Sequence, residues 1–546
     1  MSVIHKNLDL VPAPQNTSYR GCSVRRIAAF AITGAVISFC LFISLVNRID
    51  FHPDEAIYLA RVPVNLLNDS GVFYNAWYWL STLGDPTPLS ARLSCAMLGS
   101  IFIASLIFAF GIWFSNQIYW MFVAIPIIFF ASYQGIFLII RVRPELSWLC
   151  VSGVILASLV AVKYHPNSIF QFSAICALVL LPMNHRLSWI ACACISGYLM
   201  LFGWKEFGRS FTLLAIVAMP VGVLLNFIIR PVLLGGSFET AIVEFIRSTE
   251  GGPRMPPLHF LHNVFWECSM VFTDTSATPN WWTTLLPVRF HAIANHHAIA
   301  VWLWAASCIQ PFIAKTATQR YALSVPWIVL ALMYAAGYFN PTYFSIFSIY
   351  SIMSFLFIAL QTEQRTLVRI ACGTTIVISI FNGTSFLSTR VLNHGRASFF
   401  DVERELRMFV RSLPPDTTIA VPERFQSIGT FHPGRYFVIY KDQVPENVDY
   451  MIIDQYDYEI YSRFISDYTA KQNQIDNATI TYNLLATRIV PVYWRDKALP
   501  NSPNPKYELV QGSWFFRNGV NYRITILQHQ SRSDDKPKSP AILFPG

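Results

Sequence analysis

Long apolar runs separated by short polar connections fill the chain up to about residue 387. Each run has about 17–25 residues, which is the length that an α-helix needs to cross a hydrocarbon core of about 30 Å. The pattern therefore predicts about eleven membrane-spanning helices. Their approximate ranges are 26–46, 90–114, 118–140, 146–162, 167–183, 187–204, 210–230, 298–314, 321–339, 342–360 and 367–387.

The pattern changes beyond residue 387. Apolar residues at helical spacing over 401–413 are followed by a turn and a short strand at 414–422, and by β-rich runs at 435–440 and 448–454. The tripeptide RNG between YELVQGSWFF and NYRITILQH indicates a hairpin. We predict a membrane domain and a small α/β domain with a disordered end. Their ranges are 1–387 and 388–546.

The composition agrees with a polytopic membrane protein. Only 13% of the residues are charged and 54% are hydrophobic, whereas a soluble globular protein carries about 25% charged residues. The net charge of +9 suits anionic lipid head groups and basic cytoplasmic loops, so we expect membrane lipids and no nucleic acid as partners. None of the ten cysteines follows Cys372 and no CxxC motif occurs, which excludes a disulfide framework in the tail.

Basic residues gather in alternate connections, which predicts the orientation of the chain. With the N-terminus inside, the cytoplasmic side receives Lys6, Arg20, Arg25, Arg26, Lys163, Lys205, Arg209, Lys315, Arg320, Arg365 and Arg369. The opposite side receives fewer: Arg48, Arg141, Arg143, Arg186 and Arg230. The loops at about 47–89 and 231–297, and the tail, are then extracytoplasmic.

The first of these loops carries two adjacent acids, Asp54 and Glu55, in the stretch RIDFHPDEAIYLARVP. A carboxylate close to the apolar boundary loses hydration, which raises its proton affinity and suits it to accept a proton from a hydroxyl or an amine. A second motif, RVRPELSW, places Arg141 and Arg143 on the same predicted side. Guanidinium groups at an interface are good partners for a phosphate. Acids and arginines at the lip of an apolar bundle suit a sugar linked to a lipid phosphate.

These pieces, in this order, resemble the GT-C superfamily of integral-membrane glycosyltransferases, and more narrowly its protein O-mannosyltransferase and bacterial aminoarabinose lipid A transferase branches. The resemblance rests on PDEAIY (53–58), on GD and PLSARL within 84–93, and on RPE (143–145). It implies that Asp54 activates or orients the acceptor, that Glu55 supports it, and that Arg143 lies near the phosphate of the donor.

One departure concerns the donor phosphate. Many members of the family carry a lysine or a histidine before a proline in the segment that matches 73–79, and this chain has neither there. The resemblance then implies either that Arg61, Arg92, Arg141 and Arg143 rebuild the phosphate site, or that the chain is an inactive scaffold. No cofactor is implied, no metal site is indicated, and a divalent ion stays possible.

The expected function is transfer of a sugar from a polyprenyl-phosphate carrier to an envelope acceptor such as lipid A, another glycan or a protein. The expected place is the bacterial inner membrane, with the C-terminal domain in the periplasm. A transporter or flippase of envelope lipids is the alternative from another class. Transporters usually show internal repeats and ionisable residues near the membrane midplane, whereas the charges here stand at the ends of the apolar runs.

Overall fold

The computed structural model describes most of the helical region and part of the tail. The described ranges are 23–46, 72–81, 87–114, 118–132, 145–185, 187–234, 256–262, 296–335, 341–361, 364–392, 399–422, 425–439, 448–454, 482–492 and 520–529, with single positions 134, 135, 138, 142, 239 and 264.

Apolar helices dominate the region before residue 393, and the chain is a multi-pass membrane protein. Within the described residues, four helices are long and apolar enough to cross a membrane: α1 (Val24–Val46), α4 (Pro88–Trp113), α7 (Glu145–Tyr164) and α11 (Arg209–Leu234). Longer helices near the tail are α18 (Pro341–Leu360) and α19 (Thr366–Leu392). The shorter elements are α3 (Val72–Ser81), α5 (Ile118–Ala131), α8 (Ser168–Leu180), η2 (Leu181–Met183), α9 (Ser188–Tyr198), η3 (Leu199–Gly203), α10 (Trp204–Glu206), α13 (Pro257–His262), α15 (His296–Ser307), η7 (Gln310–Ile313), α16 (Ala317–Leu323) and α17 (Val325–Ala335).

Each predicted span has an apolar helix at its position, although several are shorter or interrupted. The span predicted at 187–204 consists of α9, the π-helical turn η3 and α10. Helix α5 contains Pro126, which removes a backbone donor from its interior. Helix α19 continues past the predicted end at 387 to Leu392. The total of eleven spans stays a prediction.

Glycines allow close packing between helices. A Cβ at Gly383 of α19 would lie 1.7 Å from the carbonyl oxygen of Ala131 in α5, and one at Gly222 of α11 would lie 2.0 Å from that of Val179 in α8. Small residues let helix backbones approach in this way, and van der Waals packing is the main attraction between helices in lipid.

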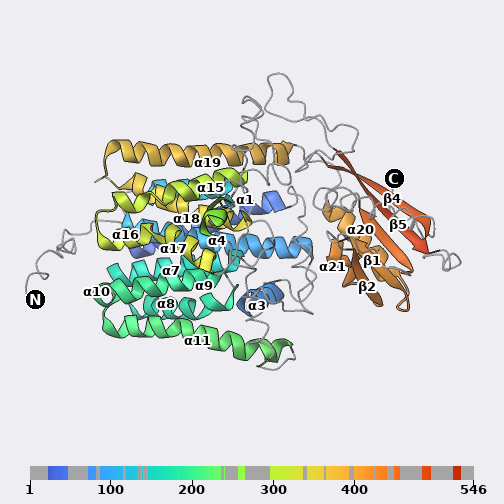
Figure 1. The fold of residues 1–546 in the computed structure, drawn as a ribbon, viewed down its shortest axis with the longest axis horizontal. Coiled ribbons are helices and arrows are strands. Elements are labelled where there is room, and N and C mark those ends of the chain that lie inside the picture. Colours follow the sequence, from blue (N-terminus) through green and yellow to red (C-terminus); the bar gives the residue numbers. More distant parts are fainter. Residues whose placement is uncertain are drawn as a thin grey trace, which may run out of the picture.

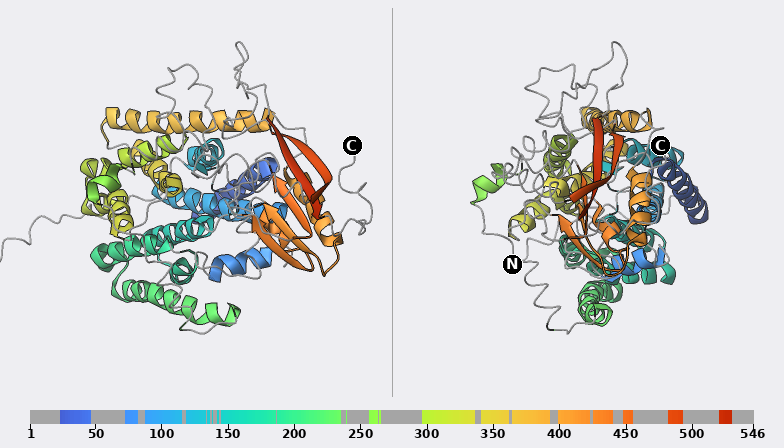
Figure 2. Two further views of the ribbon diagram at one scale, coloured as in Figure 1. Left: turned by 45° about the vertical axis from the view of Figure 1, so that its right-hand side comes forward. Right: turned by 90° about the vertical axis from the view of Figure 1, so that its right-hand side faces the viewer.

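The helices run roughly along one direction, and the C-terminal domain lies at one end of the bundle (Figures 1 and 2). We call this the sheet-side end; α3 and the first turn of α4 lie there. The opposite, far end carries α10 and α16. The sequence analysis assigns the sheet-side end to the extracytoplasmic side, and this orientation stays a prediction.

The C-terminal domain is built on a five-stranded mixed sheet of order β2-β1-β3-β5-β4. The strands are β1 (Thr418–Pro422), β2 (Arg435–Ile439), β3 (Tyr450–Asp454), β4 (Tyr482–Val492) and β5 (Val520–His529). The predicted helix and the first three strands are confirmed. The predicted hairpin is wrong, because β5 pairs with β4 on one edge and with β3 on the other, both antiparallel. The segment 507–516, which was expected to pair with β5, lies outside the described residues.

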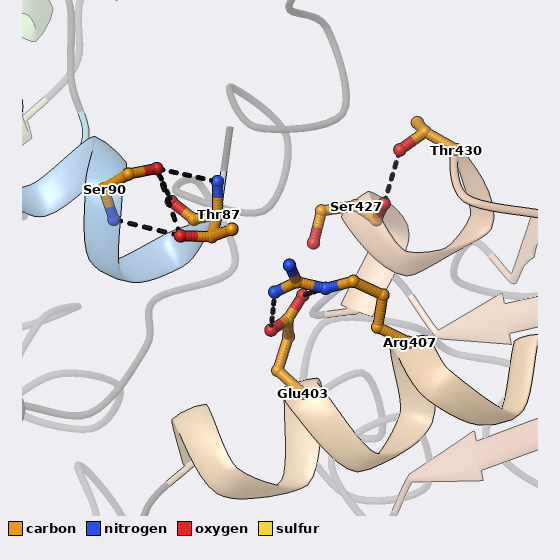
Figure 3. A network of polar contacts seen from close by, with 6 residues as sticks. All are labelled: Thr87, Ser90, Glu403, Arg407, Ser427 and Thr430. Atoms are coloured by element: carbon orange, nitrogen blue, oxygen red, sulfur yellow. Dashed lines mark hydrogen bonds and ion pairs between the residues drawn. The ribbon is translucent and has the colours of Figure 1, made fainter. Parts of the chain in front are cut away.

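Two helices accompany this sheet: α20 (Phe399–Ser412) and the short α21 (Gln426–Gly429). The apolar face of α20 buries Leu406, Phe409 and Val410, and the Phe409 ring meets Tyr450 of β3 edge-on. Figure 3 shows the polar face of α20 in the same close view as the start of α4, where Thr87 and Ser90 form a capping box.

Candidate active site

The structure describes one of the six residues predicted for the site, Arg92. The other five, Asp54, Glu55, Arg61, Arg141 and Arg143, lie outside the described residues. The candidate site is therefore built here from Arg92 and the polar groups at the same end of the bundle.

Arg92 lies in the second turn of α4 and is fully buried, with 0% of its surface exposed. Its Nη1 donates a hydrogen bond of 2.7 Å to the carbonyl oxygen of Val46. Val46 is the last residue of α1, where carbonyl groups lack partners within the helix and the helix dipole is negative. Because arginine keeps its charge in proteins, the fold holds a positive charge inside the sheet-side end. The loop with Asp54 and Glu55 continues from Val46.

Glu145 opens α7 at the same end. It is 0% exposed and stands in the first turn, where a negative charge interacts favourably with the helix dipole. Val142 is also 0% exposed. In the sequence, the predicted phosphate ligand Arg143 stands between these two buried positions. Burial of Glu145 within the RPE motif is a feature that the sequence analysis did not predict.

The aromatic segment at 72–81 forms the helix α3. Aromatic residues at this position in the chain suit either an interfacial belt or a wall against a sugar ring or a lipid tail. Helix α3 has side chains that suit each interpretation. Tyr74 and Tyr78 are buried, with 1% and 0% of their surface exposed, whereas Trp79 and Leu80 are exposed at 53% and 63%.

Polar contacts attach α3 to the bundle. The backbone N–H of Val72 donates to Oδ1 of Asn226 in α11 over 3.2 Å. Nε1 of Trp77 donates to Oγ of Ser94 over 2.9 Å, and the hydroxyl groups of Ser94 and Ser81 lie 2.6 Å apart. Ser94 lies two residues after Arg92, so these bonds attach α3 to the part of α4 that carries the buried guanidinium.

Trp148 is a further residue of this end that the sequence analysis did not single out. Its indole is 4% exposed, and its ring centroid lies 6.4 Å from that of Phe347 in α18. Within the described residues its Nε1 has no hydrogen-bond partner. The spacing i, i+3 from Glu145 places both side chains on one face of α7, and this spacing is the signal that could have drawn attention to it.

Aromatic side chains from α18 and from the end of α4 pack together at the far end. Phe357 of α18 meets the rings of Phe110, Trp113 and Phe114 of α4 at centroid distances of 6.4, 5.3 and 5.6 Å. This contact joins the same two parts of the bundle that Trp148 and Phe347 join nearer the sheet-side end.

A cluster of polar side chains surrounds Glu206 of α10 at the far end. It accepts hydrogen bonds from the hydroxyl groups of Tyr198 at 2.6 Å and Thr318 at 3.3 Å, and Nζ of Lys163 lies 3.3 Å from Oε2. The four residues come from α10, α9, α16 and α7, so this carboxylate links helices that are distant in sequence.

Within the described residues, no group of three histidine, cysteine or acidic side chains is arranged to hold a metal ion. The rings of His259 and His262 in α13 are stacked at 6.3 Å. The side chains of His291, His296 and His297 lie outside the described part of the chain.

No protein-family description and no curated protein matches the chain. Several solved structures resemble it, and two of them are ArnT and AftD. ArnT from Cupriavidus metallidurans, bound to undecaprenyl phosphate, has 12% identity and a TM-score of 0.40 over 92% of this chain and 98% of its own. The arabinofuranosyltransferase AftD from Mycobacteria has 12% identity and a TM-score of 0.43 over 93% of this chain and 40% of its own. Likenesses with identities and TM-scores this low carry no argument about the superfamily or the activity of this chain.

Proposed function

We propose that this chain is a membrane glycosyltransferase that moves a sugar from a polyprenyl-phosphate carrier to an acceptor of the cell envelope. The observation that carries the proposal is the fully buried guanidinium of Arg92 bonded to the end of α1. The guanidinium is a permanent cation, and its planar fork matches the geometry of a phosphate. The phosphate of a lipid carrier is an anion that reaches such a position from the membrane.

In this proposal, the acids of the loop after α1 activate the acceptor. Asp54 takes a proton from the hydroxyl or amine of the acceptor, and the acceptor oxygen or nitrogen attacks the anomeric carbon of the sugar. The bond between that carbon and the phosphate oxygen breaks, and its electron pair leaves with the phosphate. Arg92, together with Arg61, Arg141 and Arg143, stabilises the departing phosphate. Glu55 supports Asp54.

The test is a comparison of envelope lipids and glycans from cells with and without the gene. A mass difference of one sugar on a glycolipid, a glycan or a protein is the expected result. Asp54→Asn should abolish this difference while the protein still inserts into the membrane. Glu206→Gln is the matched control, because it removes a carboxylate at the far end and should leave transfer within about threefold.

Two results would contradict the proposal. Unchanged glycans with altered uptake of a solute or lipid would favour the transporter. Unchanged glycans and unchanged uptake, with a bound envelope protein, would favour the inactive scaffold. Full transfer by Asp54→Asn would remove the role of this acid alone.

A further inference from the structure

Three side chains with hydrogen-bonding groups form a stripe along one face of α7: Glu145, Trp148 and Ser152. Their spacing of three and four residues stacks them over two turns of the helix, starting from its sheet-side end. Neither Nε1 of Trp148 nor Oγ of Ser152 has a hydrogen-bond partner within the described residues. The stripe therefore offers a hydrogen-bond donor and a hydroxyl group beside a buried acid.

The stripe lies where two groups of helices meet. Helix α7 packs along α4 and α8, whereas α18 packs along α15 and α19. The ring of Trp148 reaches across to Phe347 of α18. At the far end, Phe357 of α18 and the aromatic side chains at the end of α4 join the same two groups of helices. Trp148 thus stands on the sheet-side part of this boundary, at the end that also holds Arg92.

A buried indole N–H without an acceptor needs an explanation, because tryptophan usually finds a hydrogen-bond partner when it is buried. Leaving such a donor unpaired costs free energy comparable to a lost hydrogen bond. Ligand sites commonly combine an apolar wall with a few placed polar groups that fix orientation. A sugar ring suits this combination, since it presents both C–H faces and hydroxyl oxygens.

We propose that Trp148 binds the sugar of the donor, with its indole N–H donating to a sugar hydroxyl. This inference rests on the proposed function and adds a residue that selects the sugar. The phosphate of the carrier lies nearer Arg92, and the ring of the sugar lies against the aromatic pair Trp148 and Phe347. Ser152 provides a second hydroxyl contact one turn deeper.

Binding to the full-length protein in detergent tests this assignment. The probes are a short-chain polyprenyl phosphate and the same carrier bearing glucose, mannose, galactose or arabinose. Trp148→Phe keeps an aromatic ring against Phe347 and removes the N–H. It should weaken binding of the preferred sugar-bearing carrier by about 3- to 10-fold, which is the loss of one hydrogen bond. Binding of the bare carrier should stay within about twofold.

Trp113→Phe is the matched control, because Trp113 lies in the aromatic cluster at the far end; it should change neither affinity. An equal loss for both carriers, or no loss for either, in Trp148→Phe would overturn the assignment and leave the proposed function intact. A wild-type protein that binds no carrier at all would overturn the proposed function and this inference with it. Thermal unfolding of each variant in detergent confirms that the binding-deficient protein is folded.

Discussion

The two ends of the helical bundle treat a buried acid in different ways. At the far end, Glu206 is 11% exposed and its charge is matched by Lys163, Tyr198 and Thr318, all on helices. At the sheet-side end, Glu145 and Arg92 are fully buried where helices meet the segments that carry the predicted site. The far end joins four helices through one acid, whereas the sheet-side end buries two charged side chains, and the indole N–H of Trp148 there has no partner within the described residues.

The difference indicates at which end of the bundle costly buried polar groups serve binding. Polar groups inside an apolar bundle are expensive unless their partners are complete, so they are retained mainly at sites of ligand or ion binding. The cluster around Glu206 has the complete set expected of a structural link. The sheet-side end has the composition expected of a binding site. Substitutions at the two ends should therefore separate activity from stability.

The largest effect is expected from Arg92→Lys. Lysine keeps the charge and loses the planar fork, which binds the Val46 carbonyl and, in the proposed function, also the phosphate of the donor. Sugar transfer should fall by about 100-fold or more, chiefly through weaker interaction with the donor phosphate. The measurement is kcat/KM for donor and for acceptor. A loss confined to the acceptor constant would contradict the phosphate role.

A smaller and purely structural effect is expected along α19. Gly383→Ala would place a methyl group 1.7 Å from the carbonyl oxygen of Ala131, near the sheet-side end. Separating these helices should cost about 1–3 kcal/mol. Gly373→Ala is the control on the same helix, because nothing lies within 4 Å of its added Cβ, and better helix propensity should make it neutral or stabilising. The measurement compares the thermal unfolding midpoints of Gly383→Ala and Gly373→Ala in detergent. Equal midpoints would refute the close contact.

Glu206→Gln sharpens the comparison at the far end. Glutamine keeps one of the two acceptor oxygens, so it can accept from Tyr198 or from Thr318 in this geometry, and it loses the charge that faces Lys163. We expect a loss of about 1–2 kcal/mol, since hydrogen bonds to charged groups are stronger than neutral ones and Lys163 is partly exposed. Lys205→Gln next to it, on an exposed side chain, should leave the unfolding midpoint unchanged. A strong loss of transfer in Glu206→Gln would mean that the far end also serves the reaction.

The smallest effect concerns the C-terminal domain, where Arg407 binds Glu403 through Nε at 3.1 Å and through Nη2 (Figure 3). Burial raises the pKa of Glu403 above its ordinary value of 4.5, and the hydrogen bond from Arg407 and the charges of Arg407 and Arg411 oppose the rise. The folded protein then binds more protons than the unfolded chain between the ordinary and the raised pKa. The contribution of this group to stability is full below pH 4.5 and declines as pH rises through the raised pKa.

Unfolding of the wild type and of Glu403→Gln from pH 4 to pH 7 measures this contribution. The wild type should lose stability relative to the variant as pH rises through that range, and the difference should be constant above it. A difference that grows in favour of the wild type with rising pH would show that the ion pair with Arg407 outweighs burial. Arg411→Gln, one turn from Arg407 and stacked like it on Phe431, should raise the pKa of Glu403 further.

Several features could be predicted from local sequence alone. The spans, the helix at 401–413 and the first three strands were predictable because each depends on a short hydrophobic period. The hairpin was not, because β5 has partners from 450–454 and 482–492, and pairing across such distances leaves no local signal. The same holds for the candidate site. Sequence motifs predicted the acids and the arginines, whereas the absence of a hydrogen-bond partner for the indole N–H of Trp148 within the described residues could be found only in the tertiary structure.

Hydropathy and charge in the sequence determined that this protein crosses a membrane many times, and the short periods after the last apolar run predicted a helix and strands there. These properties follow from transfer of side chains between water and lipid, which acts on each segment separately. Only the tertiary structure decided that Arg92 would be buried against the end of α1, that Glu206 would join four helices, and that β5 would lie between β3 and β4. Each of these depends on which distant segments pack together, and packing is a property of the whole chain.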